Sequence, residues 1–323
     1  MRYIVIGAGA VGGTIGARLF QGGHDVVLIA RGAHYEALKS GGLRLITPDS
    51  TETLDVPAAD GPVPTRDDDV LIVATKSQDT ISALDPWPRH LPVVCAQNGV
   101  DNERTVLRRF EKVYGMCVWL PASHLEPGTV AAFGHPYSGM LHVGRYPQGV
   151  DEISRQLVTD LNKSGMYGLD APDVMRWKYA KLLGNLNNAV DAVCRSGSGG
   201  EALTEQARAE GMAVLEEAGI PYATPSEQAE VRGNKVDVRP IEGIERGGGS
   251  SWQSLARSSG SIEADYLNGE IVLLGREYGI PTPANEVLQR EANRHAREKL
   301  PPGSMSAAEL AALIDERSAA VSR

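Results

Sequence analysis

The sequence predicts an α/β domain built on a parallel sheet, followed by a domain that is all helical. Several short apolar runs in the first half have the composition of strands buried on both faces, among them residues 3–6, 70–75 and 92–96. A glycine-rich turn follows the first run and leads into a segment with a helical spacing of apolar residues. From residue 174 onward the helical spacing dominates. We therefore expect an α/β domain over residues 1–169 and an all-helical domain over residues 170–323.

Length, charge and cysteine content exclude several classes of protein. A chain of 323 residues is long enough for two domains. Its net charge of −9 and the absence of a basic run argue against nucleic acid or an anionic membrane as a partner. No apolar stretch approaches the roughly 18 residues of a membrane span, and the first strand begins too early to leave room for a signal peptide. Three widely spaced cysteines indicate free thiols in the cytoplasm and no metal site.

The turn at residues 7–12 has the pattern G-x-G-x-x-G between a strand and a helix, which is the context that dinucleotide binding requires. Gly7 permits the tight turn, Gly9 lets a pyrophosphate approach the backbone, and Gly12 lets helix and strand pack closely. Ala10 and Val11 open the helix, whose first N–H groups and partial positive charge favour phosphate. We expect a Rossmann-type domain; the alternative is a glycine-rich turn without a ligand.

The residues after the second strand, at 24–29, indicate which dinucleotide is bound. An NAD site usually has an Asp or Glu here to accept hydrogen bonds from the ribose 2′-hydroxyl. This chain instead has Ala30, Arg31 and Gly32. Because Arg31 can pair with a 2′-phosphate, the sequence favours NADPH over NADH. Alternatively, Arg31 is a solvated surface residue.

Two further polar residues follow strands of the predicted sheet. Lys76 comes after the strand at 70–75, and Asn98 comes after the strand at 92–96. Ligands of open α/β sheets lie beyond the carboxyl ends of the strands, so both residues are candidates for the cofactor site. The alternatives are a solvated lysine and an ordinary Asn-Gly turn.

The helical half carries an unusual polar cluster. Within one predicted helix at 175–194, Lys181, Asn185 and Asn188 fall at i, i+4 and i+7 and share a face. Asparagine is a poor residue for a helix interior, so the cluster indicates a site, although a solvated polar stripe is the alternative. Glu263 borders an apolar face and needs a partner, for which Lys181 is the natural candidate. Glu263 could instead cap a helix that starts near Ser261.

The combination of motifs resembles the ketopantoate reductase family, over nearly the whole chain. The pairing of a lysine and an Asn four residues later with a Ser and a Glu twelve apart is the specific part. The residues that carry the resemblance are Gly7–Gly12, Ala30-Arg31, Lys76, Gln97-Asn98-Gly99, Pro127-Gly128, Trp177, Lys181-Leu182, Asn185, and the segment from Ser251 through Glu263 to Asp265-Tyr266-Leu267-Asn268-Gly269.

This resemblance implies NADPH-dependent reduction of a 2-oxo acid to a 2-hydroxy acid, most specifically 2-dehydropantoate to pantoate in pantothenate biosynthesis. It implies that Lys181 protonates the carbonyl oxygen while Glu263 binds the developing hydroxyl and holds the lysine. Asn185 and Ser251 would grip the substrate, with Asn188 as a further contact. Arg31, Lys76 and Asn98 would line the NADPH site. Helical second domains of this kind often supply dimer contacts, so a homodimer is a further expectation.

Two positions depart from the family pattern. A second substrate asparagine is usual where this chain has Ala189, and another is frequent where it has Gly248. Carbonyl reduction is therefore better supported than ketopantoate as the substrate. The alternatives are a family member acting on another ketone or an imine, and a non-catalytic NADPH-sensing protein.

Overall fold

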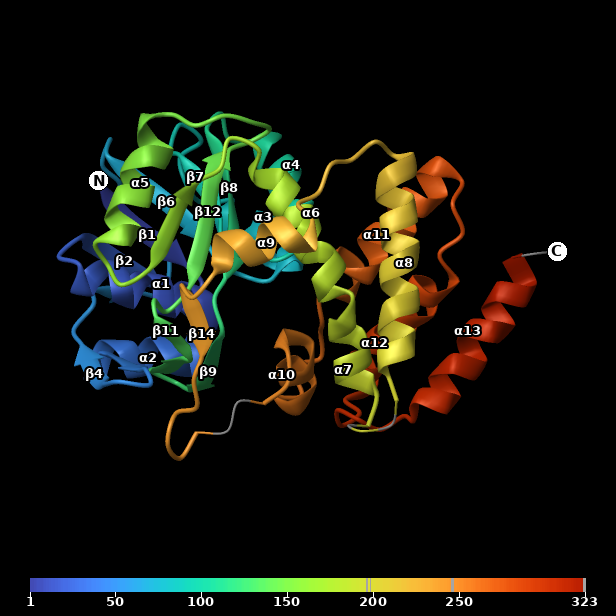
Figure 1. The fold of residues 1–323 in the computed structure, drawn as a ribbon. Coiled ribbons are helices and arrows are strands. Elements are labelled where there is room, and N and C mark those ends of the chain that lie inside the picture. Colours follow the sequence, from blue (N-terminus) through green and yellow to red (C-terminus); the bar gives the residue numbers. More distant parts are fainter. Residues whose placement is uncertain (196, 198, 245–246, 322–323) are drawn as a thin grey trace. The chain divides into compact units, whose positions relative to one another are not determined.

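The computed structural model describes residues 1–195, 197, 199–244 and 247–321 (Figure 1). The chain forms two compact units. The first comprises Met1–Asn98, Asn102–Lys178 and Ala223–Arg246, and the second comprises Gly99–Asp101, Tyr179–Tyr222 and Gly247–Arg323. As predicted, the first unit is an α/β fold and the second is helical. The expected division at residues 169 and 170 treats each part as one continuous segment, whereas in the structure residues 223–246 return to the first unit.

The first unit is organised by an eight-stranded sheet of order β13-β12-β8-β7-β6-β1-β2-β5. The strands from β8 to β5 in this order are parallel, and β12 runs antiparallel to β8. The strands are β1 (Arg2–Ile6), β2 (Asp25–Ile29), β5 (Ala58–Ala59), β6 (Asp69–Val73), β7 (Val93–Cys95), β8 (Val113–Trp119), β12 (Met140–Arg145) and β13 (Tyr167–Asp170). The helices of this unit are α1 (Ala10–Gln21), α2 (Gly32–Gly41), α3 (Thr80–Leu84), α4 (Asn102–Leu107), α5 (Glu152–Asn162), α9 (Pro225–Arg232) and the start of α6 (Val174–Asn185), with a 3-10 turn, η1 (Ser77–Asp79).

The central strands read as continuous apolar runs because both faces of the sheet are covered. Successive side chains of β1 alternate between two separate hydrophobic clusters, as the two-residue repeat of a strand requires. Tyr3 and Val5 belong to one cluster, and Ile4 and Ile6 belong to the other. All four are buried, so the strand contributes to the core on both sides.

Smaller sheets complete the first unit. One has the order β4-β3-β10-β9, from β3 (Leu43–Ile46), β4 (Thr51–Leu54), β9 (Ala122–Glu126) and β10 (Thr129–Ala132). The other pairs β11 (Gly134–Pro136) with β14 (Val236–Val238). The sequence of residues 227–238 alone predicts a helix, and this prediction is wrong in its second half. Gly233, at φ +45°, ends α9, and the alternating Val236 and Val238 form a strand because β11 offers an edge to pair with.

The second unit consists of helices: the end of α6, α7 (Asn187–Val193), α8 (Glu201–Glu217), α10 (Ser250–Ala256), α11 (Asn268–Tyr278), α12 (Pro283–Glu298) and α13 (Ala307–Val321), with a 3-10 turn, η2 (Ala264–Tyr266). The single helix expected at 175–194 is interrupted at Leu186, which separates α6 from α7. The sequence of residues 262–278 predicts one helix, but α11 begins only at Asn268, after η2. In the described part of the chain we find no helix whose length and apolarity would let it cross a bilayer.

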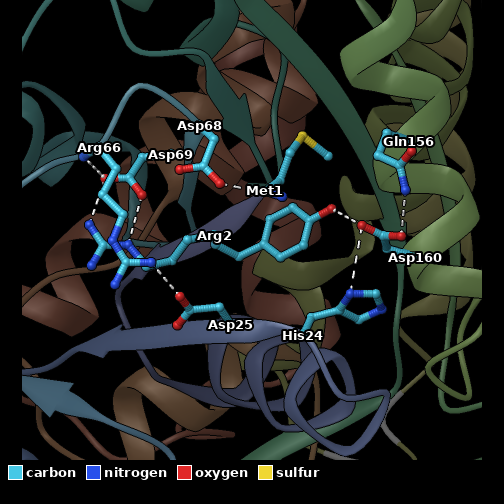
Figure 2. A network of polar contacts seen from close by, with 10 residues as sticks. Met1, Arg2, His24, Asp25, Arg66, Asp68, Asp69, Gln156 and Asp160 are labelled. Carbon is cyan, nitrogen blue, oxygen red and sulfur yellow. Dashed lines mark hydrogen bonds and ion pairs between the residues drawn. The ribbon is translucent and has the colours of Figure 1, made fainter.

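A polar network holds the amino-terminal ends of β1 and β6 together (Figure 2). Arg2 donates from Nε and Nη2 to the two carboxylate oxygens of Asp69, at 2.7 Å each, and both side chains are buried. Tyr3 donates its hydroxyl to Asp160 of α5 at 2.6 Å. These contacts hold the amino-terminal ends of the strands, whereas the predicted cofactor residues Arg31, Lys76 and Asn98 follow the opposite, carboxyl ends.

Candidate active site

The glycine-rich turn joins β1 to α1, and its geometry accounts for two of the glycines. A Cβ on Gly12 would lie 2.1 Å from the carbonyl oxygen of Gly7 and 2.9 Å from Cβ of Ala74, so only glycine fits. Gly7 itself has φ +96°, a conformation that favours glycine. Both observations agree with the expected roles in turning and close packing.

The third glycine faces open space. No atom lies within 4 Å of the position that a Cβ on Gly9 would occupy. Gly9 is the N-cap of α1, no side chain caps the helix, and no acidic residue lies in its first turn. The N–H groups around Ala10 and Val11 are thus not engaged by a capping side chain and are placed at the positive end of the helix dipole. The turn fits the phosphate groups of a dinucleotide.

The other predicted cofactor residues follow strands that neighbour β1. Arg31 follows β2, Lys76 follows β6 and Asn98 follows β7, and the order β7-β6-β1-β2 brings all of them to the carboxyl edge of the same sheet as the glycine turn. Arg31 is exposed, whereas Lys76 and Asn98 are half-buried. Asn98 also forms the turn that its sequence suggests, because Gly99 has φ +77°.

A buried amide network connects the segments that follow β6 and β7. Gln97 donates to the carbonyl of Thr75 at 3.0 Å and to the hydroxyl of Thr80 at 2.7 Å. Thr80 donates in turn to Asn102, whose amide nitrogen donates to the carbonyl of Asn98 at 3.1 Å. Sequence reasoning missed Thr80 and Asn102, since neither belongs to a motif and their pairing depends on the fold.

In the second unit, Lys181 and Asn185 lie one turn apart on α6, and Asn188 lies on α7. The backbone bond from Leu186 N–H to Leu182 is retained, but the Leu186 carbonyl accepts a hydrogen bond from Nδ2 of Asn268 at 3.2 Å. This bond ties the start of α11 to the junction of α6 and α7.

The polar side chains of Lys181 and Asn185 on α6 are partly buried. Lys181 is half-buried, as is Asn185, and the Asn185 Nδ2 atom is buried without a hydrogen-bond partner among the described residues. An unsatisfied buried donor costs about 1–3 kcal/mol. Such a cost is typical of a position that meets a ligand.

Glu263 is half-buried and precedes η2. Its side chain makes no capping hydrogen bond there, and the next helix begins only at Asn268. Glu263 is thus the N-cap residue of η2 by position, and it does not cap an α-helix. The segment that carries Glu263 is linked to α6 and α7 through the bond from Asn268 to Leu186.

Ser251 is buried at the start of α10, which packs against α7. Gly249, the N-cap of α10, donates its N–H to Asp191 of α7 at 2.6 Å, and a Cβ on Gly249 would lie 3.2 Å from Oδ1 of Asn188. Asn188 and the start of the Ser251 helix are thus neighbours. Sequence reasoning missed Asp191. An acidic residue one turn after an Asn in a helix belongs to no motif, so nothing in the sequence marked it as a site residue.

The two departures from the family pattern have physical reasons. Ala189 is 2% exposed, so in this helix it belongs to the core. A Cβ on Gly248 would lie 2.6 Å from Cγ of Trp252 and 2.7 Å from Oδ2 of Asp191. An asparagine at position 248 would therefore not fit unless α10 moved.

The fold and these features define the class, an NAD(P)-dependent oxidoreductase with an α/β unit and a helical unit. The family model for ketopantoate reductase PanE/ApbA matches residues 3–148, and the model for the ketopantoate reductase PanE/ApbA C-terminal part matches residues 173–296. The chain belongs to this family, and it is thus an oxidoreductase that acts on CH–OH groups.

Individual relatives agree over almost the full length. The 2-dehydropantoate 2-reductase of Archaeoglobus fulgidus is 31% identical over 297 residues, which are 89% of this chain and 95% of the relative. A crystal structure of a PanE/ApbA family ketopantoate reductase from Ralstonia eutropha JMP134 is similar with a TM-score of 0.76 and 29% identity, over 93% of this chain and 99% of that one. D-mandelate dehydrogenase, solved with NADH and anilino(oxo)acetate, shares the fold with a TM-score of 0.78 at 22% identity, over 93% of this chain and 100% of that one.

Proposed function

We propose that this protein uses NADPH to reduce a 2-oxo acid to the 2-hydroxy acid, and that the substrate is 2-dehydropantoate, the precursor of pantoate in pantothenate biosynthesis. The observation that carries the proposal is the pairing on α6 of a half-buried cation, Lys181, with an amide donor of Asn185 that has no hydrogen-bond partner among the described residues. A keto acid offers a carbonyl oxygen and a carboxylate, which are acceptors for both groups.

In this proposal the carboxyl edge of the first unit holds the dinucleotide. The turn from Gly7 to Gly12 binds the pyrophosphate, Arg31 pairs with the 2′-phosphate, and Lys76 and Asn98 line the remainder of the site. NADPH supplies the hydride that the carbonyl carbon accepts. The residues next to Arg31 in the sequence are Ala30 and Gly32. Neither carries a carboxylate that would repel the 2′-phosphate.

In this proposal the residues of the second unit stabilise and neutralise the negative charge that the reduction creates on the substrate oxygen. As the carbonyl oxygen becomes an alkoxide, the Lys181 ammonium stabilises it and donates a proton to it. Glu263 accepts the hydrogen bond of the new hydroxyl and orients Lys181. Asn185, Asn188 and Ser251 hold the substrate in place, which reduces the entropic part of the barrier.

The test follows the absorbance of NADPH and of NADH with 2-dehydropantoate and a panel of other 2-oxo acids. We expect turnover that prefers NADPH and that Lys181→Ala reduces by about 10²–10⁴-fold in kcat. Lys163→Ala, at an exposed lysine of the first unit, serves as the matched control and keeps the wild-type rate. NADPH binding without turnover of any carbonyl compound would instead favour an NADPH-sensing protein.

A different carbonyl or imine substrate is the second candidate, and the region around Gly248 favours it. Ala189 is buried and position 248 has no room for the family's asparagine, so two expected substrate contacts are missing. This candidate is supported if the protein reduces another compound of the panel and does not reduce 2-dehydropantoate.

We further propose that the protein works in the cytoplasm, since its three cysteines are free and buried. A homodimer is also proposed, because one solved structure of similar fold is a dimeric ketopantoate reductase from Staphylococcus aureus. Size-exclusion chromatography with light scattering measures the assembly directly.

A further inference from the structure

The turn between β9 and β10 contains Pro127-Gly128, a pair that the roles above leave unexplained. Gly128 has φ +81°, and a Cβ on it would lie 3.1 Å from Cβ of Ala37 on α2. Its carbonyl accepts the N–H of Arg44 at 2.8 Å. Its own N–H donates to Nδ1 of His34 at 2.9 Å. The loop between β9 and β10 therefore packs directly against α2.

The second ring nitrogen of His34 reaches the glycine-rich turn of the candidate cofactor site. Nε2 lies 2.7 Å from the carbonyl oxygen of Ala8. Because Nδ1 accepts the Gly128 N–H, it carries no proton, so Nε2 carries the proton and donates it to Ala8. The neutral Nε2–H form of His34 thus bridges two loops. The ring of His124 packs edge-on against it, with centroids 4.6 Å apart, and limits its rotation.

The bond to Ala8 fixes the orientation of a peptide group in the turn. In a trans peptide, the carbonyl of Ala8 and the N–H of Gly9 point in opposite directions. The N–H groups of Gly7 and Ala8 are already engaged by the carbonyl of Ile29, at 3.0 and 3.3 Å. With its carbonyl held by His34, the Ala8–Gly9 peptide plane has no freedom to turn over, and the space beside Gly9 is open.

We propose that His34 is a positioning residue for the dinucleotide: it holds the Ala8–Gly9 peptide in the orientation that receives the phosphates. The inference rests on the proposed function only in taking NADPH as the ligand. A preorganised turn binds more tightly because the ordering of the peptide precedes ligand binding. His34 needs no contact with the cofactor for this effect.

Two substitutions separate the two halves of the bridge. His34→Gln places an amide nitrogen near the position of Nε2 and keeps the donor to Ala8, but it loses the acceptor for Gly128. His34→Asn places an acceptor near the position of Nδ1 and keeps the bond from Gly128, but it is too short to reach Ala8. Glu36→Gln, at an exposed residue of the same helix, is the control.

The measurement is the Kd for NADPH, from the change in nicotinamide fluorescence, together with the thermal midpoint and kcat at saturating NADPH. We expect His34→Asn to raise the Kd about five- to tenfold, as the loss of one hydrogen bond predicts, with kcat within about twofold of wild type. His34→Gln should stay within about twofold of the wild-type Kd, even where its thermal midpoint falls as far as that of His34→Asn.

Other outcomes are equally informative. Equal affinity of His34→Asn and wild type would overturn the inference, as would a loss of affinity in both variants that follows the thermal midpoint. Failure of the wild-type protein to bind NADPH at all would instead refute the proposed function, and the two results are distinguishable in one titration series.

Discussion

His142 shows how burial without partners affects a titratable side chain. It lies on β12, is 4% exposed, and stacks on the indole of Trp177 with ring centroids 4.2 Å apart. Neither ring nitrogen has a hydrogen-bond partner among the described residues. Burial therefore lowers the pKa of His142 from its ordinary 6.5 to about 4, because the charged form loses its hydration.

This shift predicts a loss of stability in acid. The unfolded chain takes up the proton near pH 6.5 and the folded chain only near pH 4, so the contribution of His142 is complete above pH 6.5 and is lost as the pH falls from 6.5 to 4. The loss amounts to about 3 kcal/mol. Urea unfolding measures the free energy of unfolding at pH 7.5 and at pH 4.5. We expect the decrease between these two pH values to be smaller for His142→Phe than for wild type, by roughly that amount. The same difference in both proteins would contradict the assignment.

The positions of several candidate residues were predictable from sequence because they follow from local chemistry. Gly7 and Gly12 stand where the backbone leaves room for nothing else, and Lys76 and Asn98 are fixed by the ends of apolar strands. Asp191 and His34 were not predictable. Each acts on a loop distant in sequence, and a single Asp or His in a helix gives no pattern that distinguishes it from a surface residue.

The junction of α6 and α7 is set by contacts from other elements. Asn268, at the start of α11, donates both amide hydrogens, one to the Leu186 carbonyl and one to Oδ1 of Asn285. Asn285 donates to Glu210 of α8 at 2.9 Å, and Glu210 accepts the first N–H groups of α12. Burial raises the pKa of Glu210, and the hydrogen bonds from this network oppose that rise.

Removal of Asn268 should therefore affect both stability and substrate binding. Asn268→Ala removes the side-chain hydrogen bond to Leu186 and takes the Asn268 donor from the buried Oδ1 of Asn285, so we expect a loss of about 1–3 kcal/mol in the free energy of unfolding and a higher KM for the keto acid. The Kd for NADPH should not change, because the glycine turn belongs to the other unit. Denaturant titration and steady-state kinetics measure these effects. Asn293→Ala, at a half-buried amide on α12, is the control, and a KM equal to wild type in Asn268→Ala would contradict the role of the junction.

The same junction shows why element boundaries were harder to predict than element types. Apolar spacing correctly indicated helices on both sides of Leu186, and it gave no sign of the interruption. The contact at the interruption comes from an amide 82 residues away in sequence, which no local pattern contains. The strand β14 is a similar case, because Val236–Val238 extends only where β11 is present to pair with it.

At the scale of the whole molecule, α6 is the helix that begins in the first unit and continues into the second. Lys178, the last residue of its first part, forms a buried ion pair with Glu103 of α4. A buried pair costs hydration, and removal of one partner leaves the other charge uncompensated.

A matched set of substitutions tests the importance of this pair. Lys178→Met should lower the free energy of unfolding by about 3–5 kcal/mol, while Lys178→Met combined with Glu103→Leu should recover most of that loss. The reason is that the double variant leaves neither charge of this pair buried without its partner. Chemical denaturation of the three proteins provides the comparison, and additive losses in the double variant would contradict the prediction.

The return of residues 223–246 to the first unit limits how this protein can be divided. Arg176 donates to both carboxylate oxygens of Glu227 at 2.7 Å, the guanidinium of Arg232 lies 4.6 Å from the centre of the Trp119 ring, and β14 completes the pair with β11. A recombinant fragment cut after the α/β half would lack all three contacts and would expose the edge of β11. A single cut in the gene therefore cannot separate the two units from each other.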